Sequence, residues 1–281
     1  MTKTVGTWLI EAHERLKQIT ETADLDAQVL LASTLNKDRS WVLAHPEHIL
    51  ADSDIIQLAD TLGLLSGSVP LPYITGMAHF YGLEFHVTPD VLIPRPETEL
   101  LVEYAIQWCQ KHQYNHYALD VGTGSGCIAV SLAVHTPHLK VIAIDRSLSA
   151  LRIANHNSKF HRVDGRCQLI QSDLISPIYG KFGLICANLP YIPTHRLNHL
   201  QVAKVEPLSA LDGGEFGLDL IQKLLAGSVR IAADKVCLLF EIESEQGKPA
   251  LSLAEKYYPD AEFKVLRDLS GLDRLLVIER D

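Results

Sequence analysis

The feature that most constrains the fold of this chain is a regular alternation of short apolar runs with longer amphipathic segments, beginning at residue 117. The apolar runs predict strands at 117–121, 140–145, 167–171, 182–187, 236–242, 262–266 and 274–279. Apolar residues at helical spacing predict helices between them, at 126–134, 147–160, 218–232 and 245–257. Such alternation is typical of an α/β fold built on a doubly wound, mostly parallel sheet. Since only residues 268–273 separate the last two strands, no crossover helix fits there and one of the two should run antiparallel.

The segment before residue 117 has a different pattern. From residue 7 to about residue 65 the apolar residues recur at helical spacing, which predicts three or four short helices. The next runs, 73–75 and 79–87, are aromatic and β-branched with glycines between them, and they predict a β-hairpin. A proline-rich stretch at 92–96 then leads into a predicted helix at 97–111. We therefore expect a helical N-terminal domain at 1–70, a β-hairpin linker at 71–92 and an α/β domain at 93–281.

Charge and cysteine content limit the classes of partner and the cellular compartment. The chain has 25 lysines and arginines against 34 acidic residues, and its net charge of -9 would repel a nucleic-acid backbone. The five cysteines contain no C-x-x-C pair, so neither a disulfide framework nor a metal site is indicated. No apolar run approaches the roughly 18 residues of a membrane span, and the N-terminus lacks the apolar core of a signal peptide. We expect a cytoplasmic monomer that binds neither membrane nor nucleic acid directly and holds no metal.

A glycine-rich turn follows the first strand predicted in the α/β domain. The sequence reads Asp120-Val121-Gly122-Thr123-Gly124-Ser125-Gly126, and a helix is predicted to begin at its end. Glycines let the backbone turn tightly and approach a ligand closely, and the helix that follows offers free N–H groups. The spacing is G-x-G-x-G rather than the G-x-G-x-x-G of dinucleotide-binding proteins. Asp145 ends the next strand, where a carboxylate would accept hydrogen bonds from both ribose hydroxyls of an adenosine ligand.

Polar side chains also follow two further predicted strands. The strand at 182–187 ends in Asn188-Leu189-Pro190-Tyr191, and Asp173 follows the strand at 167–171. An open α/β sheet binds its ligands beyond the carboxyl ends of its strands, so these positions indicate a binding or catalytic site. Aspartate is common at turns, and each carboxylate alone is also compatible with a solvated surface position. The placement of Asp145 and Asp173 at successive strand ends favours the binding site.

The glycine turn and the acidic strand ends resemble those of methyltransferases that use S-adenosyl-L-methionine. The D-x-G-x-G-x-G stretch that begins at Asp120 is similar to motif I of that superfamily, and Asp145 is similar to its motif II. The resemblance places Asp173 where it accepts a hydrogen bond from the adenine amino group, with Leu174 beside the adenine ring.

The Asn188-Leu189-Pro190-Tyr191 stretch is similar to the N-P-P-Y motif of enzymes that methylate planar amide or exocyclic amino nitrogens. Such a nitrogen is a poor nucleophile because its lone pair is delocalised. If Asn188 Oδ1 and the Leu189 carbonyl both accept its N–H bonds, the lone pair can be aimed at the methyl donor. Pro190 would stiffen the loop and Tyr191 would pack against the flat group, and no general base is required.

The resemblance covers essentially the whole chain and points to one family. Residues 80–85, 92–99, 120–126, 188–191, 206–207, 211–214 and 217–218 are similar, in this order, to the HemK/PrmC family. Its members are protein-(glutamine-N5) methyltransferases that modify the glutamine of the Gly-Gly-Gln loop in class I peptide-chain release factors. The resemblance implies a helical N-terminal domain that helps engage the release factor and a hairpin linker. It also implies a Rossmann-like class I methyltransferase domain with a seven-stranded sheet.

The resemblance implies the site residues as well, and with them a class I release factor as the protein partner. S-adenosyl-L-methionine, released as S-adenosyl-L-homocysteine, is assigned to Gly122, Thr123, Gly124, Ser125, Gly126, Asp145, Asp173, Leu174 and Asn188. The substrate glutamine and the catalytic role are assigned to Asn188, Leu189, Pro190 and Tyr191.

One position departs from the family pattern, because Leu189 stands where the family usually has proline. Leucine supplies the same main-chain carbonyl, but it leaves φ free and adds an N–H. We expect a modest effect on rate, and the departure leaves open a changed substrate.

Two alternatives to glutamine methylation remain at this stage. Adenine-N6 methylation of DNA also uses motifs of this type, but the net charge and the lack of a basic target-recognition domain count against it. A non-catalytic adaptor that retains the fold is the other, and the intact glycine turn counts against it.

Overall fold

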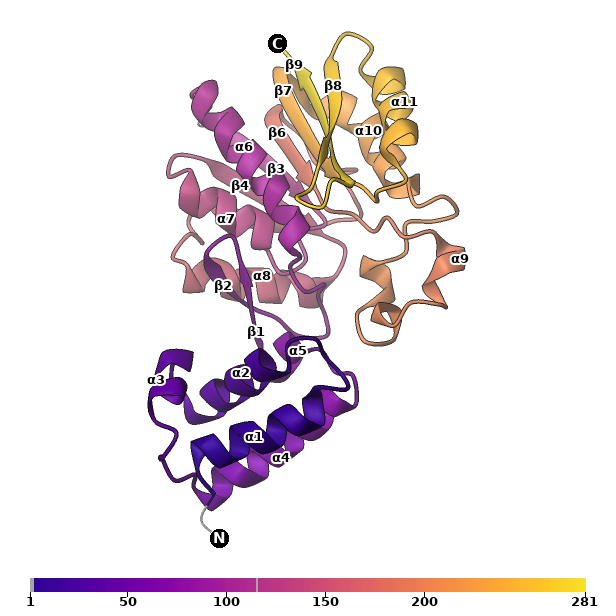
Figure 1. Cartoon of the computed structure of the whole chain (residues 1–281). Coiled ribbons are helices and arrows are strands. Elements are labelled where there is room, and N and C mark those ends of the chain that lie inside the picture. The colour runs from indigo at the N-terminus through magenta and orange to yellow at the C-terminus, as the bar shows by residue number, and fades with distance from the viewer. Residues whose placement is uncertain (1–2, 115) are drawn as a thin grey trace. The chain divides into compact units, whose positions relative to one another are not determined.

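The structure is a computed structural model that describes residues 3–114 and 116–281. The chain divides into two compact units, one ending at Met77 and the other running from Ala78 to Asp281 (Figure 1). Among the described residues, no helix combines the length and the apolar character that a membrane crossing needs.

The first unit is helical, as predicted. Its helices are α1 (Val5–Leu16), α2 (Ala23–Leu35), α3 (Arg39–Ala44), α4 (Asp52–Ser66) and α5 (Leu71–Thr75). Thr4 caps α1 with a reciprocal pair of bonds, since its side chain accepts from Thr7 N–H and Thr7 Oγ1 accepts from Thr4 N–H. The core of this unit is made of residues at the predicted helical spacing, including Leu16, Leu30 and Leu58.

The strand predicted at 73–75 is wrong, because these residues belong to the short helix α5. Pro72 lies in the first turn of α5, where proline is well tolerated because the first N–H groups of a helix have no partner within it. Ile74 packs against the helical core of the first unit. Tertiary packing therefore overrides the β-propensity of this run.

A hairpin is present within the predicted linker, but its strands β1 (Met77–Phe80) and β2 (Leu83–His86) differ from the predicted runs at 73–75 and 79–87. Phe80 and Phe85 are fully buried in the core of the second unit. Asn157 anchors the end of β2, because its Oδ1 accepts from His86 N–H at 2.8 Å and its Nδ2 donates to His86 O at 3.0 Å.

The second unit is built on a seven-stranded sheet with the order β5-β4-β3-β6-β7-β9-β8. Its strands are β3 (Tyr117–Val121), β4 (Lys140–Asp145), β5 (Cys167–Gln171), β6 (Phe182–Ala187), β7 (Ala232–Glu241), β8 (Glu262–Arg267) and β9 (Asp273–Arg280). The strands β3 to β7 pair in parallel, and β9 runs antiparallel to both β7 and β8. The predicted doubly wound, mostly parallel sheet with an antiparallel strand is confirmed.

Helices cover both faces of the sheet (Figure 1). A 3-10 turn (Pro96–Thr98) and α6 (Glu99–Lys111) pack with α7 (Cys127–His135) on one face. The helices α10 (Asp219–Ile231) and α11 (Gly247–Tyr257) pack on the other. The remaining helical segments are α8 (Leu148–Phe160), α9 (Thr194–Leu197) and the 3-10 turns Val202–Lys204 and Leu208–Ala210.

The order of the strands fixes the position of the site. From β3 the chain moves outward through β4 and β5, and it then returns to place β6 on the other side of β3. The carboxyl ends of β3 and β6 therefore diverge into loops that leave in opposite directions, which is where open α/β sheets bind ligands. The glycine turn follows β3 and Asn188 follows β6.

Candidate active site

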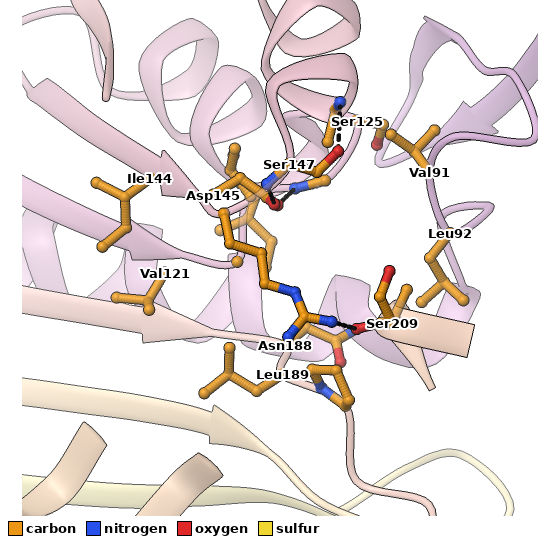
Figure 2. Close-up of a pocket in the computed structure, with 18 of the residues that line it drawn as sticks. Val91, Leu92, Val121, Ser125, Ile144, Asp145, Ser147, Asn188, Leu189 and Ser209 are labelled. Carbon is orange, nitrogen blue, oxygen red and sulfur yellow. Dashed lines mark hydrogen bonds between the residues drawn. The ribbon is translucent and has the colours of Figure 1, made fainter. Parts of the chain in front are cut away.

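A cavity in the second unit opens at the carboxyl ends of β3, β4 and β6. Figure 2 shows Asp145 and Ser147 on one side of it, Asn188 and Leu189 on another, and Val91 and Leu92 across from Asp145. The other lining residues include Gly122, Thr123, Gly124, Ser125, Asp173, Leu174 and Pro190. The structure therefore brings together nearly all of the residues assigned to the cofactor from the sequence.

The glycine turn is folded back onto the end of β4. Gly122 N–H and Thr123 N–H both donate to Ile144 O at 2.9 Å, and Gly122 has a φ of +75°. A Cβ at Gly122 would lie 2.8 Å from Leu189 Cδ2, so a larger residue would displace the Leu189 side chain and would also adopt an unfavourable positive φ. Gly122 thus packs tightly against Leu189, and both residues line the cavity.

The Asp145 carboxylate is held by two backbone groups. Its Oδ2 accepts from Gly124 N–H at 2.9 Å and its Oδ1 accepts from Ser147 N–H at 2.8 Å. A carboxylate has about four acceptor sites, so capacity remains on both oxygens for the hydroxyls of a ligand. Gly124 and Ser147 thereby fix the direction in which the remaining lone pairs point.

The two residues predicted beyond β5 also line the cavity. Asp173 is exposed, and Leu174 is half-buried with a φ of +53°. Ser172 Oγ donates to Leu174 O at 2.6 Å and holds this conformation. A left-handed leucine is an unusual backbone state that persists where the surroundings impose it, often at ligand sites.

The end of β6 presents two hydrogen-bond acceptors to the cavity. Asn188 Nδ2 donates to Thr98 Oγ1 at 3.0 Å. Within residues 3–114 and 116–281, neither Asn188 Oδ1 nor the Leu189 carbonyl accepts a hydrogen bond. The Leu189 side chain is buried and belongs to the core between the sheet and α10.

A second, smaller cavity adjoins the first on the side of Tyr191. It is lined by Leu92, Arg95, Asn188, Tyr191, Ile192, Val202, Ala210 and Leu211. Tyr191 OH donates to Glu241 Oε1 at 3.2 Å, and burial raises the pKa of the phenol, which keeps it neutral. Asn188 lines both cavities, so it lies at the junction between them.

The loop after Tyr191 is clamped by the segment around Gly213. Ile192 N–H donates to Leu211 O at 3.0 Å and Gly213 N–H donates to Ile192 O at 2.9 Å. A Cβ at Gly213 would lie 2.7 Å from Pro190 O, so the two backbones approach as closely as glycine allows. Gln246 Nε2 also donates to Tyr191 O at 2.9 Å.

Two residues with a direct role in this geometry were not singled out from the sequence. Thr98 Oγ1 donates to Glu241 Oε2 at 2.6 Å, and each residue is only 1% exposed. Burial raises the pKa of Glu241 to about 7, while the hydrogen bond from Thr98 acts in the opposite direction. Glu241 is the last residue of β7 and Asn188 is the first after β6, so the rule that places ligand sites at the carboxyl ends of strands would have indicated Glu241 as well.

Arg95 and Glu206 hold the wall of the cavity. Arg95 forms an ion pair with Glu206, whose side chain is only 3% exposed. Glu206 Oε2 also accepts from Ile93 N–H at 3.4 Å. This carboxylate ties the proline-rich segment to the loop after β6, although the two are far apart in the sequence.

Asp120, the first residue of the glycine motif, is completely buried beneath the turn. Its Oδ2 accepts from Thr123 Oγ1 at 2.6 Å and from Ala129 N–H at 3.2 Å, while its Oδ1 has no partner among the described residues. Burial raises the pKa of Asp120 to about 7. Asp120 therefore joins the turn to the start of α7.

Comparison with known proteins finds matches to an N-terminal domain and to a methyltransferase domain, in the same order along the chain. Residues 7–76 match the model of the PrmC N-terminal domain, and residues 98–205 match that of the methyltransferase small domain. A ribosomal protein L11 methylase from Lactobacillus delbrueckii subsp. bulgaricus has a similar fold, with a TM-score of 0.51 and 18% identity. That match covers 69% of this chain and 84% of the other.

Two curated relatives are much closer in sequence. The release factor glutamine methyltransferase of Moorella thermoacetica is 37% identical, over 91% of this chain and 91% of its own length. That of Coxiella burnetii is 36% identical, over 95% of both chains. Together with both family models, these matches show that the chain belongs to the release factor glutamine methyltransferase family.

Proposed function

We propose that the chain transfers a methyl group from S-adenosyl-L-methionine to the side-chain nitrogen N5 of the glutamine in the Gly-Gly-Gln motif of class I release factors. The observation that carries this proposal is the pair of acceptors at Asn188 Oδ1 and the Leu189 carbonyl. A primary amide has two N–H donors, and these two acceptors match them in number and type.

The larger cavity fits the adenosine part of the methyl donor. Asp145 has acceptor capacity for two ribose hydroxyls, and the backbone of the glycine turn lines the cavity. Asp173 would accept from the adenine amino group, and Leu174 would pack beside the ring. When bound, the donor supplies an electrophilic methyl group on a sulfonium sulfur.

The substrate glutamine would enter through the smaller cavity and meet the end of β6. Asn188 Oδ1 and the Leu189 carbonyl would accept the two N–H bonds of the substrate amide, which fixes the plane of the amide. These acceptors also stabilise the positive charge that develops on nitrogen as the new bond forms. The proton is lost after transfer, so the chain needs no general base.

Pro190 and Tyr191 would support this geometry in different ways. Pro190 limits the freedom of the loop that carries the Leu189 carbonyl, because its ring fixes φ. The ring of Tyr191 lines the smaller cavity and would pack against the flat amide. Its neutral hydroxyl stays bonded to Glu241 and does not compete for the substrate.

The protein partner in this proposal is a class I release factor, and the chain acts on it as a monomer in the cytoplasm.

Methyl transfer to a purified class I release factor tests the proposal. The chain is incubated with the methyl donor and the release factor, and the Gly-Gly-Gln peptide is analysed by mass spectrometry. We expect one added methyl group on the glutamine, and none when that glutamine is replaced by glutamate in the release factor. An unmodified glutamine peptide from the natural release factor would contradict the proposal.

A further inference from the structure

A continuous chain of hydrogen bonds links a buried carboxylate to the proposed substrate acceptor. Glu241 Oε2 accepts from Thr98 Oγ1 at 2.6 Å, and Thr98 Oγ1 accepts from Asn188 Nδ2 at 3.0 Å. The other oxygen of Glu241 accepts from Tyr191 OH at 3.2 Å. These four residues come from the 3-10 turn before α6, the first position after β6, the loop that follows it and the end of β7.

The direction of these bonds follows from the chemistry of the groups. An ionised carboxylate only accepts hydrogen bonds, so the single proton of the Thr98 hydroxyl must point to Glu241. The Thr98 oxygen can then only accept from its other neighbour. Asn188 must therefore turn its NH2 group to Thr98 and leave its Oδ1 facing the cavity.

We propose that Glu241 is a positioning residue that sets the orientation of the Asn188 side-chain amide through Thr98. This inference rests on the proposed function, in which Asn188 Oδ1 receives an N–H of the substrate glutamine. If the Asn188 amide were reversed, its NH2 group would face the NH2 group of the substrate. Two donors would then meet, and the substrate amide would lose one of its two acceptors.

A carboxylate is the group that this task requires. A glutamine at position 241 could face Thr98 with either its carbonyl oxygen or its NH2 group, because the hydroxyls of Thr98 and Tyr191 can each donate or accept, so it would not fix the direction of the Thr98 hydroxyl. Burying an acid is also unfavourable, and burial raises the pKa of Glu241 to about 7. The titratable groups that interact with Glu241 are Arg274 and Tyr191, which lower its pKa, Glu97, which raises it, and the Cys127 thiol.

The protonation state of Glu241 therefore controls the direction of the chain of bonds. When it is protonated, Glu241 gains a donor of its own, and the Thr98 hydroxyl is no longer forced to point toward it. The orientation of the Asn188 amide is then no longer fixed. We expect kcat to fall as the pH drops through about 7.

Three variants and a control test the inference. Thr98→Val keeps the shape of the side chain but removes the hydroxyl, and we expect kcat to fall about 10- to 100-fold, with the Kd of the methyl donor unchanged. Thr98→Ser should restore most of the activity. Glu241→Gln should lower kcat to a similar extent and remove the fall at acid pH.

Thr136→Val is the matched control. Thr136 Oγ1 is also buried, but among the described residues it has no hydrogen-bond partner, so we expect its kcat to match that of the natural chain. Wild-type kcat in folded Thr98→Val, or an unchanged pH profile in Glu241→Gln, would overturn the inference.

A measurement without substrate separates this inference from the proposed function. In protein labelled with 15N on asparagine, the Asn188 side-chain amide signals are identified by their loss in Asn188→Asp. We expect these signals to shift as Glu241 titrates near pH 7, and to stay constant in Glu241→Gln. Signals that do not titrate in the natural chain would refute the positioning role, whichever substrate the enzyme uses.

Discussion

Replacing Gly122 by alanine tests the close packing of the glycine turn against Leu189 at the wall of the cofactor cavity. Gly122 has a φ of +75°, and the added Cβ would lie 2.8 Å from Leu189 Cδ2. The positive φ and the close contact both strain the same turn, in which Gly122 N–H donates to Ile144 O at the end of β4. We therefore expect the turn to move, and with it the wall of the cofactor cavity.

The size of the effect follows from the two contributions. A left-handed conformation costs an alanine about 1–2 kcal/mol, and overpacking a buried contact costs about 1–3 kcal/mol. The sum is about 2–5 kcal/mol. If the turn opens to relieve this strain, a cost of about 2 kcal/mol, the lower end of the range, would weaken binding of the methyl donor about 30-fold.

Calorimetric titration with S-adenosyl-L-methionine measures the loss. Gly165→Ala is the matched control, since Gly165 has no heavy atom near its added Cβ and no positive φ, and we expect a change within about 0.5 kcal/mol. The clash is isolated by adding Leu189→Ala to Gly122→Ala and comparing the pair with Leu189→Ala alone. We expect about 1–3 kcal/mol of the loss to be recovered, which is the overpacking share. Unchanged binding by Gly122→Ala would refute the close approach seen in the structure.

Three further variants address other parts of the site. Asn188→Ala should lower kcat for the release factor at least about 100-fold while the circular dichroism spectrum is retained, and unchanged turnover would exclude its acceptor role. Glu206→Gln removes the charge that pairs with Arg95 and should lower the free energy of unfolding by about 1–3 kcal/mol in urea titrations. An unchanged free energy of unfolding would show that the ion pair does not stabilise the fold. Burial raises the pKa of Asp120 from 3.8 to about 7, so the folded state binds this proton more tightly than the unfolded state. The free energy of unfolding should therefore fall by about 4 kcal/mol as the pH increases across that interval. Asp120→Asn should flatten this pH dependence, and an equally steep curve in the variant would rule out Asp120 as its source.

Much of the second unit follows from the sequence, because its signals are local. The strands β3, β4, β5 and β6 begin and end at the predicted residues, since each is an apolar run that stops at a polar or glycine-rich turn. The site residues at these turns follow from one topological rule about the carboxyl ends of parallel strands. The helix α8 starts one residue after the predicted position 147, because Ser147 caps it and its Oγ accepts from Ala150 N–H at 3.2 Å.

What the sequence did not reveal depends on contacts between distant segments. The run at 73–75 has the composition of a strand, but Ile74 packs into a helical core that no local pattern specifies. Thr98 and Glu241 lie 143 positions apart, and their bond appears only when the turn before α6 lies beside the end of β7. Arg95 and Glu206, 111 positions apart, are a similar case. Buried polar partners of this kind are set by the assembled fold, because each satisfies a group that another segment supplies.

The structure also changes the interpretation of Leu189, the one departure from the family motif. From the sequence, the loss of proline means a looser loop with an added N–H, and the side chain has no evident role. In the structure the Leu189 side chain is 4% exposed and fills the space left open by Gly122, so burial restricts this residue in place of a proline ring.

Rigidity of the following residues has a separate source. The bonds from Ile192 and Gly213 and the bond that Gln246 donates to Tyr191 O hold the loop from both sides. The Leu189 carbonyl is thus fixed between a buried side chain and a clamped backbone, and the acceptor keeps its position without a proline at 189. Leu189→Ala should therefore lower kcat more than the departure from proline does, because it removes the buried contact that restricts this residue in place of a proline ring. A Leu189→Ala enzyme with the kcat of the natural chain would show that the backbone clamp alone is sufficient.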